Sequence, residues 1–246
     1  MFNPLSGLLE VPLHLVGRYQ SSKTSLEVVL RCFFTIIKYK LKTKRQKDSK
    51  MVLPLDFLDT MAWDVAVSGV LLAAASITLP YDSVTGLIGE KNRQLRVGFA
   101  VAIGACGLYL FLSGLAISFI WPFTIANGAY NVLFGGIASL GGLVLLAGAL
   151  ALFLNTNLRP VAYFAAVAGV YSVVDAYAIA INGLTSSPLL AALGYLSFAA
   201  PAFLSVPAAH SKSKYWRWLF AVFALVFAAA WLYQAANFTL AHLQPS

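Results

Sequence analysis

The chain has 246 residues, of which 60% are hydrophobic and only 11% are charged, with a formal net charge of +8. A soluble domain has about 45–50% apolar and about 25% charged residues, so this composition excludes an ordinary water-soluble protein. Ten basic and three acidic residues lie in residues 1–50, whereas the remainder has seven and six. The remainder is therefore nearly neutral and has no basic stripe, which argues against a nucleic-acid partner.

Residues 1–50 form a basic extension that precedes the membrane domain. The extension would place ten basic residues on the outer face of the membrane, just before the first span. The remaining basic residues lie in loops that the positive-inside rule assigns to the opposite face. A chain that starts at Met51 removes this conflict. We therefore hypothesise that residues 1–50 are an over-extended gene start and that residues 51–246 form the six-span domain. Peptides from upstream of Met51 in the mass spectrum of the purified protein would refute this hypothesis.

Six apolar stretches follow, each with about the 20 residues that a helix needs to cross a bilayer. A single apolar segment in lipid must satisfy its own backbone hydrogen bonds, so helices are expected. The predicted fold class is all-α, a polytopic membrane helix bundle with six transmembrane helices. The predicted spans are Phe57–Leu79, Val97–Ile120, Asn131–Leu154, Pro160–Ile181, Leu189–Val206 and Trp218–Leu240.

Three residue types support this assignment. Prolines lie near most span ends, whereas Pro201 lies inside the fifth span and predicts a kink. Aromatic residues near span ends are typical of an interfacial belt: Trp63, Trp121, Tyr130, Trp216, Trp218, Trp231 and Tyr233. Small residues inside the spans predict close helix packing within the bundle rather than a dimer seam: Gly104, Gly107, Gly114, Gly135, Ser139, Gly142, Gly148, Ala165 and Gly169.

Basic residues between the spans occur only in alternate loops. Loops 80–96, 155–159 and 207–217 hold all seven, and the other two loops and the C-terminal tail hold none. The positive-inside rule makes these three loops cytoplasmic and places both termini of the six-span core outside. We expect a multi-pass protein of the plasma membrane, in contact with membrane lipids. The seven residues are Lys91, Arg93, Arg96, Arg159, Lys212, Lys214 and Arg217.

Polar side chains within the spans gather in the predicted outer half. An Asp within a span costs about 3 kcal/mol on insertion scales, so Asp175 indicates function, for example in a proton relay. Alternatively, Tyr171 and Ser172 share its helical face and hydrogen-bond it locally. Asp64 lies at a similar depth, and there the local interpretation is favoured because a water-accessible helix start is near. The candidate polar site comprises Asp64, Asn131, Tyr171, Ser172, Asp175, Gln234 and Asn237.

Residues that would carry catalysis or bind a metal do not form a recognisable set in the sequence. His210 falls in a predicted inner loop and His242 in the outer tail, so the two cannot bind one metal or haem. Cys32 and Cys106 are interpreted as unpaired small apolar residues. We therefore expect no metal and no cofactor, and the sequence favours a protein that is not an enzyme.

The predicted outer loops contain two motifs, one that begins with Trp121-Pro122 and ends at Gly135, and another from Gly183 to Pro188. They resemble the motifs of an uncharacterised prokaryotic membrane family, domain of unknown function 981. The resemblance covers about Phe57 to Leu243, and one departure is Ile120, where the family usually has a polar residue. It implies the six-span architecture and no particular mechanism. The motifs are interpreted as tight turns with interfacial anchors or as a ligand site. Their residues are Trp121, Pro122, Tyr130, Asn131, Phe134 and Gly135, then Gly183, Leu184, Thr185, Ser187 and Pro188.

Three functions are consistent with these features. The favoured one is an interaction or accessory subunit of a membrane complex, with a membrane-protein partner or self-association. The second is a small-solute or proton-coupled transporter, with Asp64 and Asp175 facing an outward polar cavity. The third is an outer-leaflet enzyme acting on a lipid or quinone, which would need a nucleophile or metal that the sequence does not display.

Overall fold

The computed structural model describes residues 57–82, 85, 87–89, 92–123, 128–185 and 187–242. These residues belong to a compact unit that spans Pro54–Ser246. The predicted extension, residues 1–50, and the predicted start at Met51 lie outside the described residues.

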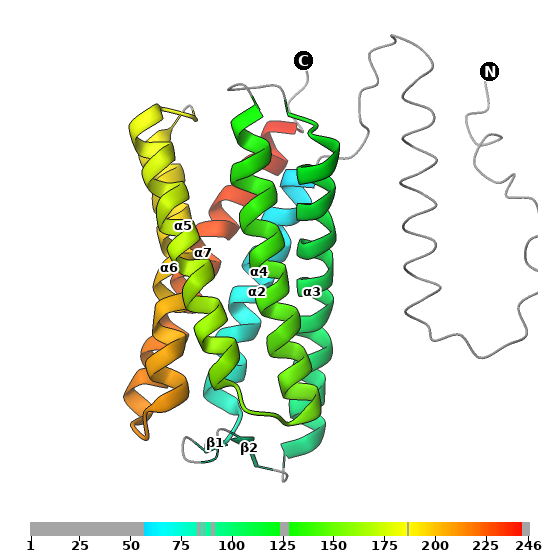
Figure 1. The fold of residues 1–246 in the computed structure, drawn as a ribbon, viewed down its shortest axis with the longest axis vertical. Helices are drawn as coiled ribbons and strands as arrows, with labels where there is room; N and C mark the ends of the chain where they lie inside the picture. Colours follow the sequence, from blue (N-terminus) through cyan, green and yellow to red (C-terminus); the bar gives the residue numbers. More distant parts are fainter. Residues whose placement is uncertain are drawn as a thin grey trace, which may run out of the picture. The chain divides into compact units, whose positions relative to one another are not determined.

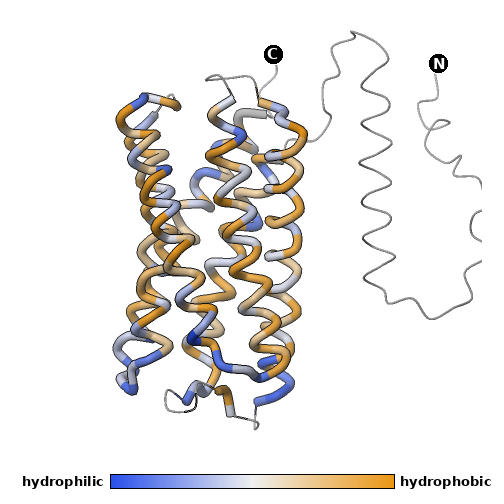
Figure 2. Tube along the Cα trace, viewed as in Figure 1, coloured by the Kyte–Doolittle hydropathy of each residue, from blue (hydrophilic) through white to orange (hydrophobic). Residues whose placement is uncertain are grey.

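Six long helices make up most of the described chain, which confirms the predicted fold class (Figure 1). All six are long and apolar enough to cross a bilayer. Figure 2 shows the corresponding hydropathy, with hydrophilic residues concentrated near the two ends of the helices. The helices are α2 (Phe57–Thr78), α3 (Arg93–Ile120), α4 (Ala129–Leu154), α5 (Arg159–Asn182), α6 (Pro188–His210) and α7 (Lys214–His242).

Three helices extend beyond the predicted spans at charged or proline-containing ends, and one of them, α7, begins at Lys214 instead of Trp218. Helix α3 begins at Arg93 instead of Val97, because the side chain of Arg96 is buried against the end of α4 rather than exposed in a loop. Helix α6 continues through Pro201 and Pro207 to His210. Between α2 and α3, the short strands β1 (Tyr81–Asp82) and β2 (Leu87–Ile88) pair antiparallel, which the sequence did not predict.

The helices form a ring in which each packs against two principal neighbours. Sequential neighbours touch from α2 to α7, and α7 returns to pack against α2. The most extensive contacts join α3 to α4, α5 to α6 and α2 to α7, whereas α2 with α3 and α4 with α5 pack least. Three tight helix pairs therefore form the ring, and the first and last helices close it (Figure 1).

Glycines allow the backbones within each tight pair to approach closely. A Cβ added to Gly107 of α3 would lie 2.8 Å from the backbone nitrogen of Leu146 in α4, and one on Gly142 would lie 2.7 Å from Cα of Phe111. Gly69 lies against α7 and Gly169 against α6 in the same way. The prediction that small residues serve packing within the bundle is confirmed at Gly107, Gly142 and Gly169.

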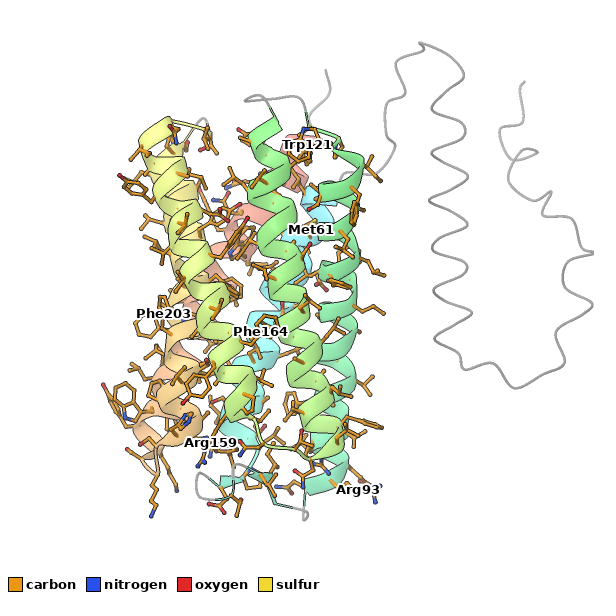
Figure 3. The ribbon with its side chains drawn as sticks, viewed as in Figure 1. Met61, Arg93, Trp121, Arg159, Phe164 and Phe203 are labelled. Atoms are coloured by element: carbon orange, nitrogen blue, oxygen red, sulfur yellow. The ribbon has the colours of Figure 1, made fainter. Side chains whose placement is uncertain are left out.

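The two ends of the ring differ in chemistry. One end, called the basic end below, holds Arg93, Arg96, Arg159 and Arg217. The other, called the Trp121 end, holds the turn between α3 and α4. Figure 3 shows Arg93 and Arg159 at the basic end and Trp121 at the opposite end.

Candidate functional site

The first family motif folds into a clamped turn at the Trp121 end. Trp121 ends α3 in the left-handed conformation, at φ 53°, and Gly128 precedes α4 at φ 83°. Asn131, fully buried, receives a hydrogen bond from the backbone nitrogen of Phe123 at 3.0 Å and donates to the carbonyl of Phe123 at 2.6 Å. This amide fixes the chain on both sides of the turn, so Asn131 has a structural role outside the Asp175 group.

Aromatic side chains connect the first motif to the second. The rings of Phe123, Tyr130 and Phe134 pack edge to face, with centroids 5.7–6.5 Å apart. The hydroxyl of Tyr130 donates to the carbonyl of Leu184 at 2.6 Å. Gly183, at φ 59°, ends α5 just before this carbonyl. The two motifs thus share one contact, which holds the turn after α3 beside the turn after α5.

Arginines at the basic end satisfy the last carbonyl groups of neighbouring helices. Arg96 is 3% exposed and donates to the carbonyls of Leu152 and Phe153 at the end of α4. Arg217 of α7 donates to the carbonyls of Ser76 and Leu79 at the end of α2. Cations at helix C-termini complement both the unpaired carbonyls and the negative end of the helix dipole.

Tyr81 extends this polar layer between α2 and α6. Its hydroxyl donates to the carbonyl of Ala209, near the end of α6, at 2.7 Å. Burial raises the pKa of Tyr81, and the positive charge and hydrogen bond of Arg159 oppose that shift. The phenol is therefore neutral at physiological pH and remains a hydrogen-bond donor.

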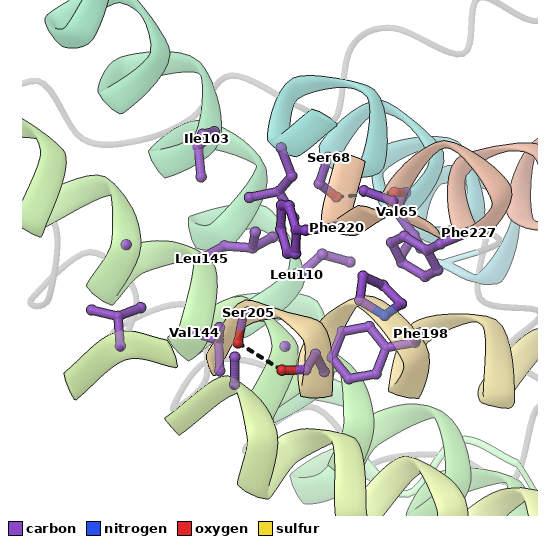
Figure 4. A pocket seen from close by; sticks show the side chains of 18 of the residues that line it. Val65, Ser68, Ile103, Leu110, Val144, Leu145, Phe198, Ser205, Phe220 and Phe227 are labelled. Carbon is purple, nitrogen blue, oxygen red and sulfur yellow. Dashed lines mark hydrogen bonds between the residues drawn. The ribbon is translucent and has the colours of Figure 1, made fainter. Parts of the chain in front are cut away.

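An apolar cavity of about 280 Å³ lies inside the ring and is lined by residues from all six helices. Its lining runs from Leu58 and Phe238 at the Trp121 end to Tyr81 and Arg217 at the basic end. Figure 4 shows side chains from α2, α3, α4, α6 and α7 around the space, including Val65, Ile103, Leu145, Phe198 and Phe227. Most lining residues are aliphatic or aromatic.

Asp175 lies inside the protein without the local hydrogen bonds that the sequence suggested. The residue is 6% exposed, and its buried Oδ2 has no hydrogen-bond partner among the described residues. Ser172 donates instead to the carbonyl of Tyr195 at 2.7 Å, and the phenol of Tyr171 lies over Gly136. The carboxyl group interacts electrostatically with Tyr171 and Tyr195.

The other predicted polar residues do not join Asp175. Asp64 is half-buried and contacts the thiol of Cys106 on α3. Gln234 is half-buried and Asn237 is exposed. Of the seven predicted polar residues, the described cavity lining includes Ser172 alone. The structure therefore brings together Tyr171, Ser172 and Asp175 but separates them from the polar residues of α2, α4 and α7.

Two aromatic residues that sequence reasoning did not place in a site line the cavity together with Ser172. Tyr195 of α6 is 4% exposed and donates to the carbonyl of Leu133 at 3.2 Å. Trp231 of α7 packs edge to face on Tyr195, with ring centroids 6.3 Å apart. Its indole nitrogen is buried without a partner in the described chain, so assigning Trp231 to the interfacial belt was wrong. The position of Trp231, well before the end of α7, is the sequence feature that could have indicated its interior location.

Comparison with known proteins agrees with the motif resemblance. The sequence profile of the family described as "Protein of unknown function (DUF981)" matches residues 51–245. No curated protein and no solved structure matches the chain. Because the match covers most of the sequence, this membrane protein, with six long apolar helices in its described part, belongs to the DUF981 family.

Proposed function

We propose that the protein binds a lipophilic small molecule in the cavity at the centre of its helix ring. The observation that carries this proposal is the apolar lining, which all six helices contribute. A polar solute would lose its hydration there and regain few hydrogen bonds, whereas an apolar molecule gains dispersion contacts. The cavity therefore favours a lipophile over the small polar solute of a conventional transporter.

The size of the cavity supports this proposal. An engineered apolar cavity of about 150 Å³ stays dry and binds benzene, and the volume here is about 280 Å³. Ligand entry from the lipid would be easiest between α4 and α5, which is among the least packed contacts of the ring. The bilayer would then serve both as the source of the ligand and as its route.

Filling the cavity should weaken binding without disturbing the helix pairs. Gly141 lines the cavity, and a Cβ added there would meet only Phe198 Cε2, at 4.0 Å. We expect Gly141→Leu to weaken the binding of decane at least tenfold, because the leucine side chain occupies the space of the ligand. Displacement of a lipophilic fluorophore from the protein in nanodiscs measures this change.

The matched control for this experiment is Gly98→Leu. Gly98 is exposed on α3, and a Cβ there meets nothing within 4 Å. This variant adds the same side chain to a helix surface outside the cavity and should leave decane affinity unchanged. Equal affinities in Gly141→Leu, Gly98→Leu and the parent protein would refute the proposed function.

We further propose that the basic end faces the cytoplasm of a cell whose plasma membrane holds the protein. Thr156 lies between α4 and α5 at the basic end, Asn182 ends α5 at the Trp121 end, and both are exposed. After Cys32→Ser and Cys106→Ser, an impermeant maleimide should label Asn182→Cys in intact cells. It should label Thr156→Cys only after permeabilisation, and the reverse pattern would contradict the proposed orientation.

A membrane-protein partner remains a separate proposal. The small residues that motivated it are occupied by contacts within the helix pairs, as at Gly107, Gly142 and Gly169. Support therefore has to come from the assembled complex. Native purification that recovers a second membrane protein in fixed ratio would provide it, and recovery of the chain alone would count against it.

A further inference from the structure

The cavity has one charged side chain on its wall, at the basic end. Arg217 is the only charged residue among the described residues that line the space, and most of the others are aliphatic or aromatic. The residue is half-buried and belongs to the first turn of α7. A cation on the wall of an apolar space inside a membrane bundle is costly, which makes it a candidate ligand-binding group.

The guanidinium group of Arg217 keeps hydrogen-bonding capacity after its contacts with α2. Its hydrogen bonds to described residues both come from Nη2, which donates to the carbonyl oxygens of Ser76 and Leu79. A guanidinium group has five N–H groups, so Nε and Nη1 retain three donors. A ligand that accepts hydrogen bonds can therefore bind Arg217 without breaking the contacts that hold α7 against α2.

The polar groups nearest to Arg217 in the described chain are engaged elsewhere. The hydroxyl groups of Ser76 and Tyr81, which also line the cavity, donate to backbone carbonyls. Asp82 is exposed, and its carboxylate accepts a hydrogen bond from the hydroxyl of Thr85 at 2.9 Å. None of the described lining residues is acidic. The cavity therefore presents a positive charge without a carboxylate on the same wall.

The lining of α7 leads from this cation into the apolar part of the cavity. Its members recur every three or four residues and therefore lie on one helical face: Arg217, Phe220, Ala224, Phe227 and Trp231. The cavity volume of about 280 Å³ is nearly twice the roughly 150 Å³ that holds one benzene molecule, which leaves room for a chain of about ten carbon atoms. A molecule bound at Arg217 can therefore extend along α7 toward the Trp121 end.

The chemistry of Arg217 selects the headgroup of such a molecule. A guanidinium group donates hydrogen bonds and accepts none, so it repels an ammonium group and gains no hydrogen bond from it. A hydroxyl group accepts a hydrogen bond but leaves the positive charge without a counterion. A carboxylate or phosphate group accepts charge-assisted hydrogen bonds and also offsets the charge of the arginine.

We infer that the cavity binds a single-chain lipid anion, with its carboxylate or phosphate oxygens held by Arg217 and its hydrocarbon chain extending along α7 toward the Trp121 end. This inference rests on the proposed function, because the chain of the ligand fills the same apolar space. It adds the charge of the ligand, its orientation and the residue that recognises its headgroup.

Five probes of equal chain length test the inference: decane, 1-decanol, decylamine, decanoate and decyl phosphate. Each competes with a lipophilic fluorophore on the full chain in nanodiscs of zwitterionic lipid, at about pH 8, where a carboxyl group is ionised. Affinity is referred to the probe dissolved in the lipid. We expect at least one anion to bind about tenfold more tightly than 1-decanol, the gain typical of hydrogen bonds to a charged group. Decylamine should bind less tightly than decane.

Two substitutions assign the preference to Arg217. Arg217→Gln removes the charge but keeps an amide donor for the end of α2, and it should bring the ratio of anion to decanol affinity below twofold while leaving decane affinity within twofold. Arg217→Lys keeps the charge and should retain a ratio of at least threefold. Arg93→Gln is the control and should keep the full ratio, because Arg93 is exposed and lies outside the described lining.

Photo-cross-linking tests the orientation. A decanoate with a diazirine at the end of its chain should label Ala224 or Phe227, which line the cavity farther along α7. A decanoate with the diazirine beside the carboxylate should label Ser76 or Leu79 instead, next to Arg217. Peptide mass spectrometry identifies the labelled residues, and the reverse pattern would overturn the proposed orientation.

The outcomes separate the inference from the function on which it rests. If none of the five probes competes, the proposed function fails. If decane competes and neither anion binds more tightly than 1-decanol, the apolar site stands and the anion inference is overturned. This ranking on the parent protein decides the inference even where Arg217→Gln does not fold. An anion preference that a folded Arg217→Gln protein keeps would also overturn it, and comparison of decanoate with decyl phosphate distinguishes a carboxylate ligand from a phosphate ligand.

Discussion

Gly142→Ala should destabilise the protein by about 3 kcal/mol, a cost typical of severe overpacking. A methyl group at this position would lie 2.7 Å from Cα of Phe111 and 2.8 Å from the carbonyl oxygen of Gly107. Because both contacts are with the backbone of α3, no side-chain rotation can relieve them and the two helices must separate. The midpoint of unfolding in a detergent titration measures the loss.

The neighbouring residue supplies the control for this prediction. Gly141→Ala adds the same methyl group one position earlier, where the nearest atom is 4.0 Å away in the cavity lining. Its stability should stay unchanged or rise by about 0.5 kcal/mol, because alanine reduces the entropy cost of the helix. Equal destabilisation by the two substitutions would contradict the close approach of α3 to α4.

Arg96→Ala should destabilise the protein by about 2–3 kcal/mol. The substitution removes charge-assisted hydrogen bonds to the carbonyls of Leu152 and Phe153, each typically worth about 1.5–3 kcal/mol before the helix end readjusts. It also removes the cation that complements the dipole of α4. The same detergent titration gives the size of the effect.

Arg93→Ala is the control that distinguishes the helix-capping role of Arg96 from the effect of removing one positive charge. Arg93 lies one turn earlier on the same helix and is exposed, so its loss should change stability by less than about 0.5 kcal/mol. Both variants remove one positive charge from the first turn of α3. If they destabilise the protein equally, the effect comes from the loss of charge there and Arg96 is not a cap for α4.

The sequence predicted the six long helices of the described chain, and most of their ends to within two residues, because length and hydropathy determine which segments cross a bilayer. Phe57, Ile120 and Leu154 are helix ends in both prediction and structure. It failed at Arg93 and Arg96, since a run of charged residues resembles a loop unless its buried hydrogen-bond partners are known. Those partners lie more than fifty residues away on another helix.

The candidate site was harder to predict because a membrane helix is apolar on every side. In water, polarity distinguishes the inner face of a helix from the outer one, but lipid removes that distinction. Asp175 stood out as an isolated carboxylate, so sequence reasoning found it. Leu145, Phe198 and Phe227 line the cavity, yet nothing in their type or spacing separates them from lipid-facing neighbours.

Closure of the ring by its first and last helices has a consequence for biosynthesis. Helix α2 makes its main contact with α7 and packs much less against α3. During translation α2 is therefore synthesised long before its principal neighbour exists. Gly69 can pack against the backbone of Ala224 only when translation is nearly complete. Nascent chains that terminate before α7 would hold five inserted helices around an open interior, a target for membrane proteases that the finished protein does not present.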